Sequence, residues 1–204
     1  MKTQLKFEKN SIILISIFIF LTMYYYDNQL TFVYIIENMH RIANGQWYYI
    51  FNGWTAIPYG LILQAVCAIW SLPVFILSEF GVISTTCVGA RLWYKLFVLI
   101  FLLLDTWQIG LIADKMGIES KSKMTWIRLY FISSILVILP ALHIAQMDAV
   151  YLFPVLVGIY FYLNNDYRKF LLCFAIAIPI KFIPLFIFVP LVLMKEKRYL
   201  FIAQ

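Results

Sequence analysis

Long apolar runs that contain almost no charge constrain the fold of this chain more than any other feature. They are Ser11–Tyr26, Ile57–Ser78, Leu96–Ala113, Leu129–Ala145, Ala149–Leu163 and Leu171–Met194. A helix needs about 20 apolar residues to cross a bilayer untilted, and a crossing segment must satisfy its own backbone hydrogen bonds. The pattern therefore predicts an all-α, polytopic helical membrane protein.

The composition agrees with a membrane protein and argues against two other classes. Of the 204 residues, 64% are hydrophobic and 13% are charged, whereas soluble domains have roughly 45–50% and 25%. The net charge of +6 comes from short basic clusters between apolar runs. The positive-inside rule explains such clusters, so membrane lipids and no nucleic acid are the expected partners. The three cysteines lie far apart, which is not the pattern of a disulfide framework or a metal site.

The basic clusters predict the topology. They are Lys2/Lys6/Lys9, Lys115/Lys121/Lys123/Arg128, Arg168/Lys169 and Lys195/Lys197/Arg198. If all four are cytoplasmic, an even number of crossings separates each neighbouring pair. The first apolar run ends in tyrosines and Asp27 without a small-residue cleavage site, so we expect a retained helix rather than a signal peptide. The chain is then an integral, multi-pass protein of the plasma membrane with a cytoplasmic N-terminus.

We expect one transmembrane domain over residues 1–204. Residues 11–26 form the first helix, residues 27–95 an outer loop with interfacial helices, and residues 96–113, 129–145 and 149–163 membrane helices. The run at 57–78 is assigned to short interfacial helices, because prolines and glycines interrupt it and a crossing there would break the parity. Residues 171–194 contain three prolines and are expected to form a broken helical pair that turns near Lys181.

This topology places a small set of charged residues together outside the cytoplasm. Asp27, Glu37, Asp148 and Lys181 all fall on the external side. Charges beside or within membrane-length apolar sequence are costly and are usually kept for function. Side chains from distant parts of the chain are therefore predicted to share one outward-facing, partly embedded pocket.

Each of these residues has a functional and a plainer interpretation. Asp27 or Glu37 can be a general base that deprotonates a sugar hydroxyl, or a charge that marks a helix end. Asp148, with hydrogen bonds from Gln146, can organise a substrate, or it can cap a helix as an N-cap residue. Lys181 can bind a phosphate as a point charge, or its ammonium can reach the interface by snorkelling.

Other polar residues and motifs are less informative. Asp105 is the only acidic residue within a predicted crossing; such a residue faces the bundle interior or a cavity, and either a structural or a functional role is open. His40 and His143 are too few and too far apart for a metal site. The chain has no Walker loop, Gly-x-Gly-x-x-Gly, His-Glu-x-x-His or Gly-x-Ser-x-Gly motif, which leaves soluble nucleotide-dependent or hydrolase chemistry without a site.

From His143 to Met194 the sequence resembles the multi-pass glycosyltransferases of the GT-C class. Those enzymes have a Gly-Gln-x-Asp-like turn after a helix, then another helix, a basic loop and a helix broken by Lys-x-x-Pro. Here the corresponding segments are Ala145-Gln146-Met147-Asp148, the run to Leu163, Asn164–Lys169 and Ala175–Pro184. Upstream, Gly45-Gln46-Trp47-Tyr48-Tyr49 with Ile57-Pro58-Tyr59-Gly60 is similar to the first outer loop, and Leu96–Ala113 with Asp105 to the helix after it.

The resemblance implies transfer of a sugar, with mannose as the first candidate, from a polyprenyl-phosphate donor on the external membrane face. Asp27 or Glu37 would be the catalytic base, Gln146 and Asp148 would bind substrate, and Lys181 would contact the donor phosphate. No cofactor is implied, a divalent metal is left open, and the acceptor is unknown. Members of the class are longer, so the chain is expected to be a fragment or a truncated copy.

Two functions of other classes fit the same residues. A transporter or permease portion also uses broken helices with an embedded lysine. A non-catalytic membrane subunit is expected if the outer acidic side chains do not converge at one cavity.

Overall fold

The computed structural model of the chain describes residues 30–46, 60–127, 130 and 147–194. In this part of the chain every regular element is helical: α2 (Leu30–Ala43), α4 (Leu61–Glu79), α5 (Val88–Lys115), a helical segment at 120–127, α7 (Asp148–Leu163), α8 (Tyr167–Ile180) and α9 (Leu185–Leu193). The prediction of an all-α chain is confirmed for these residues. The predicted helices at 11–26 and 129–145 lie outside the described residues, apart from residue 130.

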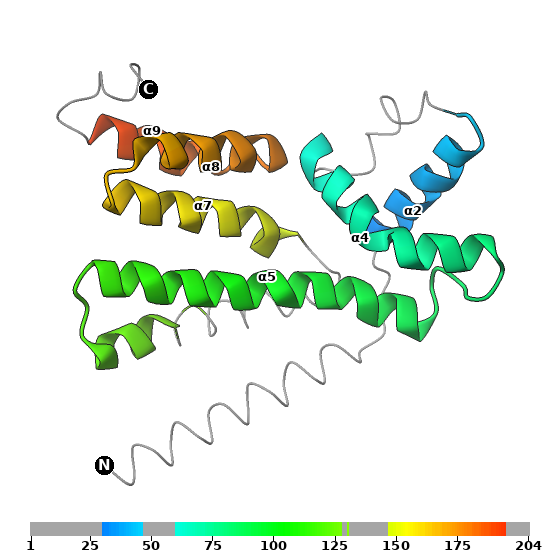
Figure 1. The fold of residues 1–204 in the computed structure, drawn as a ribbon, viewed down its shortest axis with the longest axis horizontal. Coiled ribbons are helices and arrows are strands. Elements are labelled where there is room, and N and C mark those ends of the chain that lie inside the picture. Colours follow the sequence, from blue (N-terminus) through cyan, green and yellow to red (C-terminus); the bar gives the residue numbers. More distant parts are fainter. Residues whose placement is uncertain (1–29, 47–59, 128–129, 131–146, 195–204) are drawn as a thin grey trace, which may run out of the picture.

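The helices form a stacked layer with a pair of helices at one end (Figure 1). Helix α7 packs against α5 on one side and α8 on the other, and α9 lies against α8. Helix α2 packs against α4, which also contacts α8 and α5. Gly158 of α7 allows the closest approach, because a Cβ atom there would lie 2.8 Å from the ring of Phe174 in α8. Small residues at such contacts are typical of helices that pack inside membranes.

Helix α4 differs from the prediction for its segment. The sequence predicts short interfacial helices over 57–78, whereas Leu61–Glu79 is one helix of 19 residues. Pro73 lies inside this helix, and Figure 1 shows that α4 is bent. A proline bends a helix because it has no N–H to donate and because its ring clashes with the carbonyl four residues earlier. A bend, rather than a break, results because packing against α2, α5 and α8 supports the helix.

Helix α5 begins earlier than predicted. Residues 88–95 are assigned by sequence to the outer loop, but they form the first two turns of the 28-residue helix Val88–Lys115. Cys87 caps this helix, its Sγ accepting a bond from the N–H of Ala90. Helices α4 and α5 are both long and apolar enough to cross a membrane, and α7 is a shorter apolar helix.

A pair of tryptophans joins α4 to α5. The indole Nε1–H of Trp70 donates to the carbonyl of Trp93 at 3.0 Å, and that of Trp93 donates to the carbonyl of Trp70 at 2.8 Å. Their rings stack with centroids 4.5 Å apart. Around them lies the larger core cluster, which includes Phe32, Tyr94 and Val98. The second cluster, around Phe170 and Phe174, joins α7 to α8 and α9.

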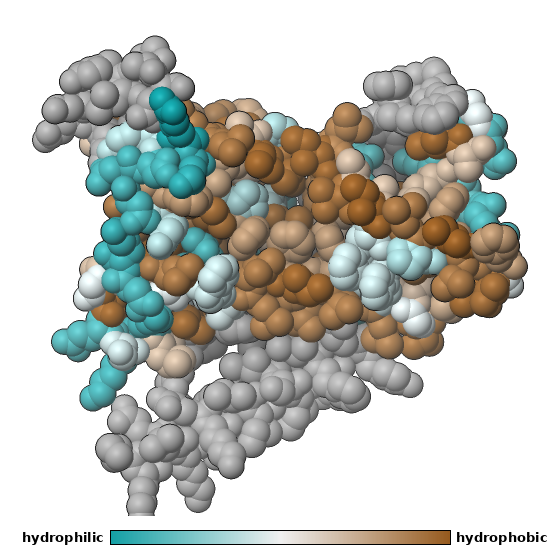
Figure 2. All heavy atoms as spheres, in the orientation of Figure 1, coloured by the Kyte–Doolittle hydropathy of each residue, from teal (hydrophilic) through white to brown (hydrophobic). Residues whose placement is uncertain are grey.

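Polar residues gather at the ends of the layer, and apolar residues cover its middle. Helices α5 and α7 both run toward the end where the 115–120 and 163–167 connections lie (Figure 1). Figure 2 shows hydrophilic residues over that end and a broad hydrophobic surface between it and the opposite end. The described parts of two basic clusters, Lys115/Lys121/Lys123 and Arg168/Lys169, therefore lie at the same end, as the topology prediction requires.

Candidate functional site

The helix break at Lys181 is the centre of the candidate site. Helix α8 ends at Ile180, Lys181 is extended with φ −151° and ψ 142°, and α9 begins at Leu185. Pro184 has no N–H, so the carbonyl of Ile180 lacks the partner that a continuous helix would supply four residues later. The chain therefore turns where the sequence predicts a break, and a carbonyl is left to be satisfied from elsewhere.

Gly60 supplies the missing donor. Its N–H donates to the carbonyl of Ile180 at 3.2 Å, just before the first residue of α4. A Cβ atom on Gly60 would lie 1.7 Å from the carbonyl oxygen of Pro179, a distance no side chain can occupy. Only glycine lets the start of α4 approach the end of α8 this closely. Two segments about 120 residues apart in sequence thus hold the break in place.

Asp148 meets Lys181 across the site. It is the first residue of α7, after the buried Met147, which is the N-cap. Its carboxylate forms an ion pair with the Lys181 ammonium, 33 residues away. The Lys181 Nζ also lies 5.1 Å from the centre of the Tyr151 ring, one turn further along α7, a cation–π contact. Asp148 is therefore not itself the N-cap, although a carboxylate in the first turn still stabilises the helix dipole.

This pair remains reachable from outside the protein. The side chains of Lys181 and Asp148 are 29% and 34% exposed, so each keeps open area next to its partner. The Asp148 carboxylate and the face of the Tyr151 ring together fix the position of the Lys181 ammonium. An anionic group that reaches it can exchange with Asp148, since both bind the same ammonium.

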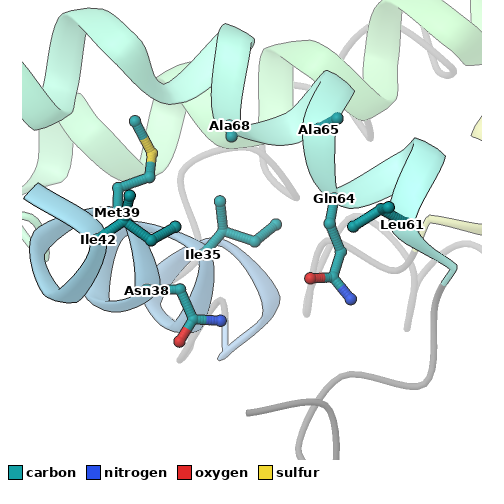
Figure 3. Close-up of a pocket in the computed structure, with 8 residues that line it drawn as sticks. All are labelled: Ile35, Asn38, Met39, Ile42, Leu61, Gln64, Ala65 and Ala68. Atoms are coloured by element: carbon teal, nitrogen blue, oxygen red, sulfur yellow. The ribbon is translucent and has the colours of Figure 1, made fainter. Parts of the chain in front are cut away.

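An apolar groove lies between α2 and α4. It has a volume of about 170 Å³ and is lined by Ile35, Asn38, Met39 and Ile42 of α2 and by Leu61, Gln64, Ala65 and Ala68 of α4. Figure 3 shows the amides of Asn38 and Gln64 extending to the same side of the two helices. Leu61 directly follows Gly60, whose N–H donates to the carbonyl of Ile180. The end of the groove that Leu61 lines is therefore near the turn at Lys181.

The predicted convergence of the acidic residues is found only in part. Asp148 and Lys181 are brought together, but Glu37 forms an ion pair with Arg41, one turn along its own helix α2. Glu37 is exposed on that helix, and its neighbour His40 pairs with Glu79 at the end of α4. Glu37 thus belongs to a surface charge group between α2 and α4. Asp27 and Gln146 lie outside the described residues.

The buried polar residues of α5 include one acid and one lysine, Asp105 and Lys95. Asp105 is fully buried and accepts a hydrogen bond at 2.8 Å from the hydroxyl of Tyr130, so this acid faces the bundle interior as its position in an apolar run predicts. Lys95 is also fully buried. The sequence-based prediction places its segment in the outer loop and does not mark Lys95 as a site residue. The signal was present, since Lys95 interrupts the apolar run that leads into Leu96.

The described residues include no cluster of three or more His, Cys, Asp or Glu side chains that could hold a metal ion. The chain matches no family model, no curated protein and no solved structure.

Proposed function

We propose that this chain is a polytopic membrane glycosyltransferase of the GT-C class. It would transfer a sugar, with mannose as the first candidate, from a polyprenyl-phosphate donor to an acceptor on the external membrane face. The observation that supports this most is the Asp148–Lys181 pair at a proline-made helix break. The pair lies away from the end that carries the basic clusters (Figure 1), which by the positive-inside rule is the cytoplasmic end.

Lys181 would bind the donor phosphate. Transfer breaks the bond between the anomeric carbon and a phosphate oxygen, so negative charge grows on the leaving phosphate. An ammonium already positioned there stabilises that charge without reorganising. The phosphate would displace Asp148 from Lys181, and the freed carboxylate, with Gln146 nearby in sequence, would accept hydrogen bonds from sugar or acceptor hydroxyls.

The groove between α2 and α4 would take the first part of the polyprenyl chain. Six of its eight lining residues are apolar, and its α4 end lies beside the turn that carries Lys181. A lipid with a phosphate at Lys181 would then direct its chain along Leu61 and Ile35. The hydrophobic effect favours that placement by about 25 cal/mol for each Å² of apolar surface removed from water.

The catalytic base would be Asp27 or Glu37, and the geometry disfavours Glu37. A base must reach the proton that it removes, and the carboxylate of Glu37 is paired with Arg41 on an exposed helix face. Asp27 is therefore the stronger candidate. The same position of Glu37 supports a second candidate function, a non-catalytic membrane subunit, because the outer acidic side chains do not all meet at one cavity.

Transfer from radiolabelled polyprenyl-phosphate mannose in membranes that express the chain tests the proposal. We expect Asp148→Asn and Lys181→Met to lower transfer by about tenfold or more, the effect of removing a charged hydrogen bond of 1.5–3 kcal/mol. Asp27→Asn should abolish transfer while Glu37→Gln retains it. The matched control is the Asp166–Lys169 pair at the start of α8, a 2.8 Å ion pair of the same residue types.

The control variants Asp166→Asn and Lys169→Met should leave transfer unchanged when equal amounts of folded protein are compared. Equal activity of the Lys181→Met variant and the parent chain would contradict the role of Lys181. Absence of transfer from mannose, glucose and galactose donors alike would contradict the enzyme and favour the non-catalytic subunit.

A further inference from the structure

A second apolar groove lies at the basic end of the layer, away from the Asp148–Lys181 pair. Its volume is about 460 Å³, and its lining is Ile109, Ile112 and Met116 of α5, Trp126 of the helical segment 120–127, and Leu156 and Ile159 of α7. Met116 and Trp126 are 53% and 42% exposed. The groove is therefore open to the surroundings, and the described side chains that line it are all apolar or aromatic.

Basic side chains from three segments lie at the same end of the layer as this groove. Lys115 adjoins Met116, and Lys121 and Lys123 lie on the helical segment that carries Trp126. The aliphatic stem of Lys123 lies over Gly110 of α5, where a Cβ atom added to Gly110 would be 3.4 Å from the Lys123 Cε. The Lys123 ammonium donates a hydrogen bond of 2.5 Å to the Asp114 carboxylate. This contact holds segment 120–127 against α5 and so forms one wall of the groove.

The first turn of α8 adds Arg168 and Lys169. Lys169 is bonded to Asp166 and lies 5.0 Å from the centre of the Phe161 ring. Within the described residues no ion pair joins Lys115, Lys121 or Arg168 to an acidic side chain. The described residues at this end include five basic side chains and three acidic ones, Asp114, Glu119 and Asp166, so the basic side chains are in excess. Figure 2 shows the resulting hydrophilic surface next to the hydrophobic one.

We propose that this groove is a binding site for an anionic glycerophospholipid of the leaflet on the basic side. An acyl chain would lie along Ile112, Leu156 and Ile159, and the phosphate would meet Lys115, Lys121 and Arg168. Basic pockets between membrane helices bind anionic headgroups in this way, and an indole such as Trp126 is favourable where chain and headgroup meet. The site rests on the membrane location of α5 and not on sugar transfer.

The test is quenching of tryptophan fluorescence by lipids with brominated chains. The full chain is placed in phosphatidylcholine vesicles that contain a minor fraction of either brominated phosphatidylglycerol or brominated phosphatidylcholine. The difference between the chain and its Trp126→Phe variant isolates the Trp126 signal. We expect brominated phosphatidylglycerol to quench Trp126 more strongly, and K115Q/K121Q/R168Q to reduce this preference by about fivefold or more.

Trp107 is the matched control, because it is also on α5 and is 59% exposed but does not line the groove. Its signal, isolated with Trp107→Phe, should be quenched equally by both lipids. The K115R/K121R variant, which keeps the charges, should keep the preference and the helix content of the parent chain. Equal quenching of Trp126 by the two lipids, or a preference that survives removal of the three charges, would overturn the proposal. No sugar donor is present, so the result is independent of the proposed transfer reaction.

Discussion

At the scale of single residues, one proline and one glycine determine where Lys181 stands. Pro184 removes the N–H that would have bonded the carbonyl of Ile180, and Gly60 provides another from α4. An unsatisfied buried carbonyl costs about 1–3 kcal/mol, which is large compared with an ion pair between side chains about one-third exposed, worth about 0.2–1 kcal/mol. The backbone contact therefore holds the turn, and the Asp148–Lys181 pair contributes little to stability.

Gly60→Ala tests this division of roles. The added methyl group would overlap the carbonyl oxygen of Pro179, so we expect a loss of about 1–3 kcal/mol in the free energy of unfolding and a lower Tm in detergent. Gly89→Ala is the control, since a Cβ there meets only the Sγ of Cys87 at 3.9 Å. A Tm of Gly60→Ala equal to that of Gly89→Ala would show that the start of α4 does not dock on α8.

At the scale of helices, α8 depends on a cap outside the apolar layer. Asp166 is the N-cap of α8, and its side chain accepts a bond from the N–H of Lys169 at 3.3 Å. The hydrogen bond from the Lys169 side chain, followed by that from its backbone N–H, holds the pKa of the Asp166 carboxyl below its usual value. Both contacts are stronger when the carboxyl group is ionised.

The stability of α8 should therefore depend on pH in one direction. A carboxyl group whose pKa is lowered by folding stabilises the folded state at pH values above its usual pKa, and this contribution is lost as the pH falls through the folded-state pKa. We expect Asp166→Asn to have a lower Tm than the parent chain at neutral pH, with the difference disappearing in acid. Circular dichroism, recorded during thermal unfolding at neutral and at acidic pH, measures the two Tm differences. A Tm difference that persists unchanged in acid would contradict this role of the ionised carboxylate.

At the scale of the whole molecule, the topology depends on where α4 lies relative to the membrane. Its 19 residues are long and apolar enough to cross a membrane, whereas the parity of the basic clusters places its segment in the outer loop. The bend of α4, its packing on α2 and the docking of its first residue near Lys181 favour the outer location (Figure 1). The α4–α5 connection would then be external and the 115–120 connection cytoplasmic.

Single cysteines in a cysteine-free background distinguish these topologies. We expect Ser84→Cys, in the α4–α5 connection, to react with an impermeant maleimide added to intact cells. Ser122→Cys, in the segment 120–127, should react only after the membrane is permeabilised. Both serines are exposed, so burial does not prevent labelling. The reverse pattern would mean that α4 crosses the membrane and that Lys181 faces the cytoplasm.

The sequence by itself determined the features that depend on neighbours along the chain. Apolar runs of membrane length predict helices because the backbone of each run must bond to itself, and Pro184 predicts the break at Lys181 because it removes one particular N–H. Likewise, the rarity of Asp105 and Lys181 among apolar residues marks them as residues with a role. These are local effects of covalent structure and solvation.

Only the tertiary structure decided which distant groups meet. No local pattern pairs Asp148 with Lys181, places Gly60 on the carbonyl of Ile180 or leaves Glu37 with Arg41. Likewise, the interruptions in 57–78 predict short helices, but packing against neighbouring helices keeps α4 continuous through Pro73. Contacts between helices depend on how their surfaces fit and on which backbone groups remain unsatisfied after each helix has formed, and both are properties of the assembled molecule.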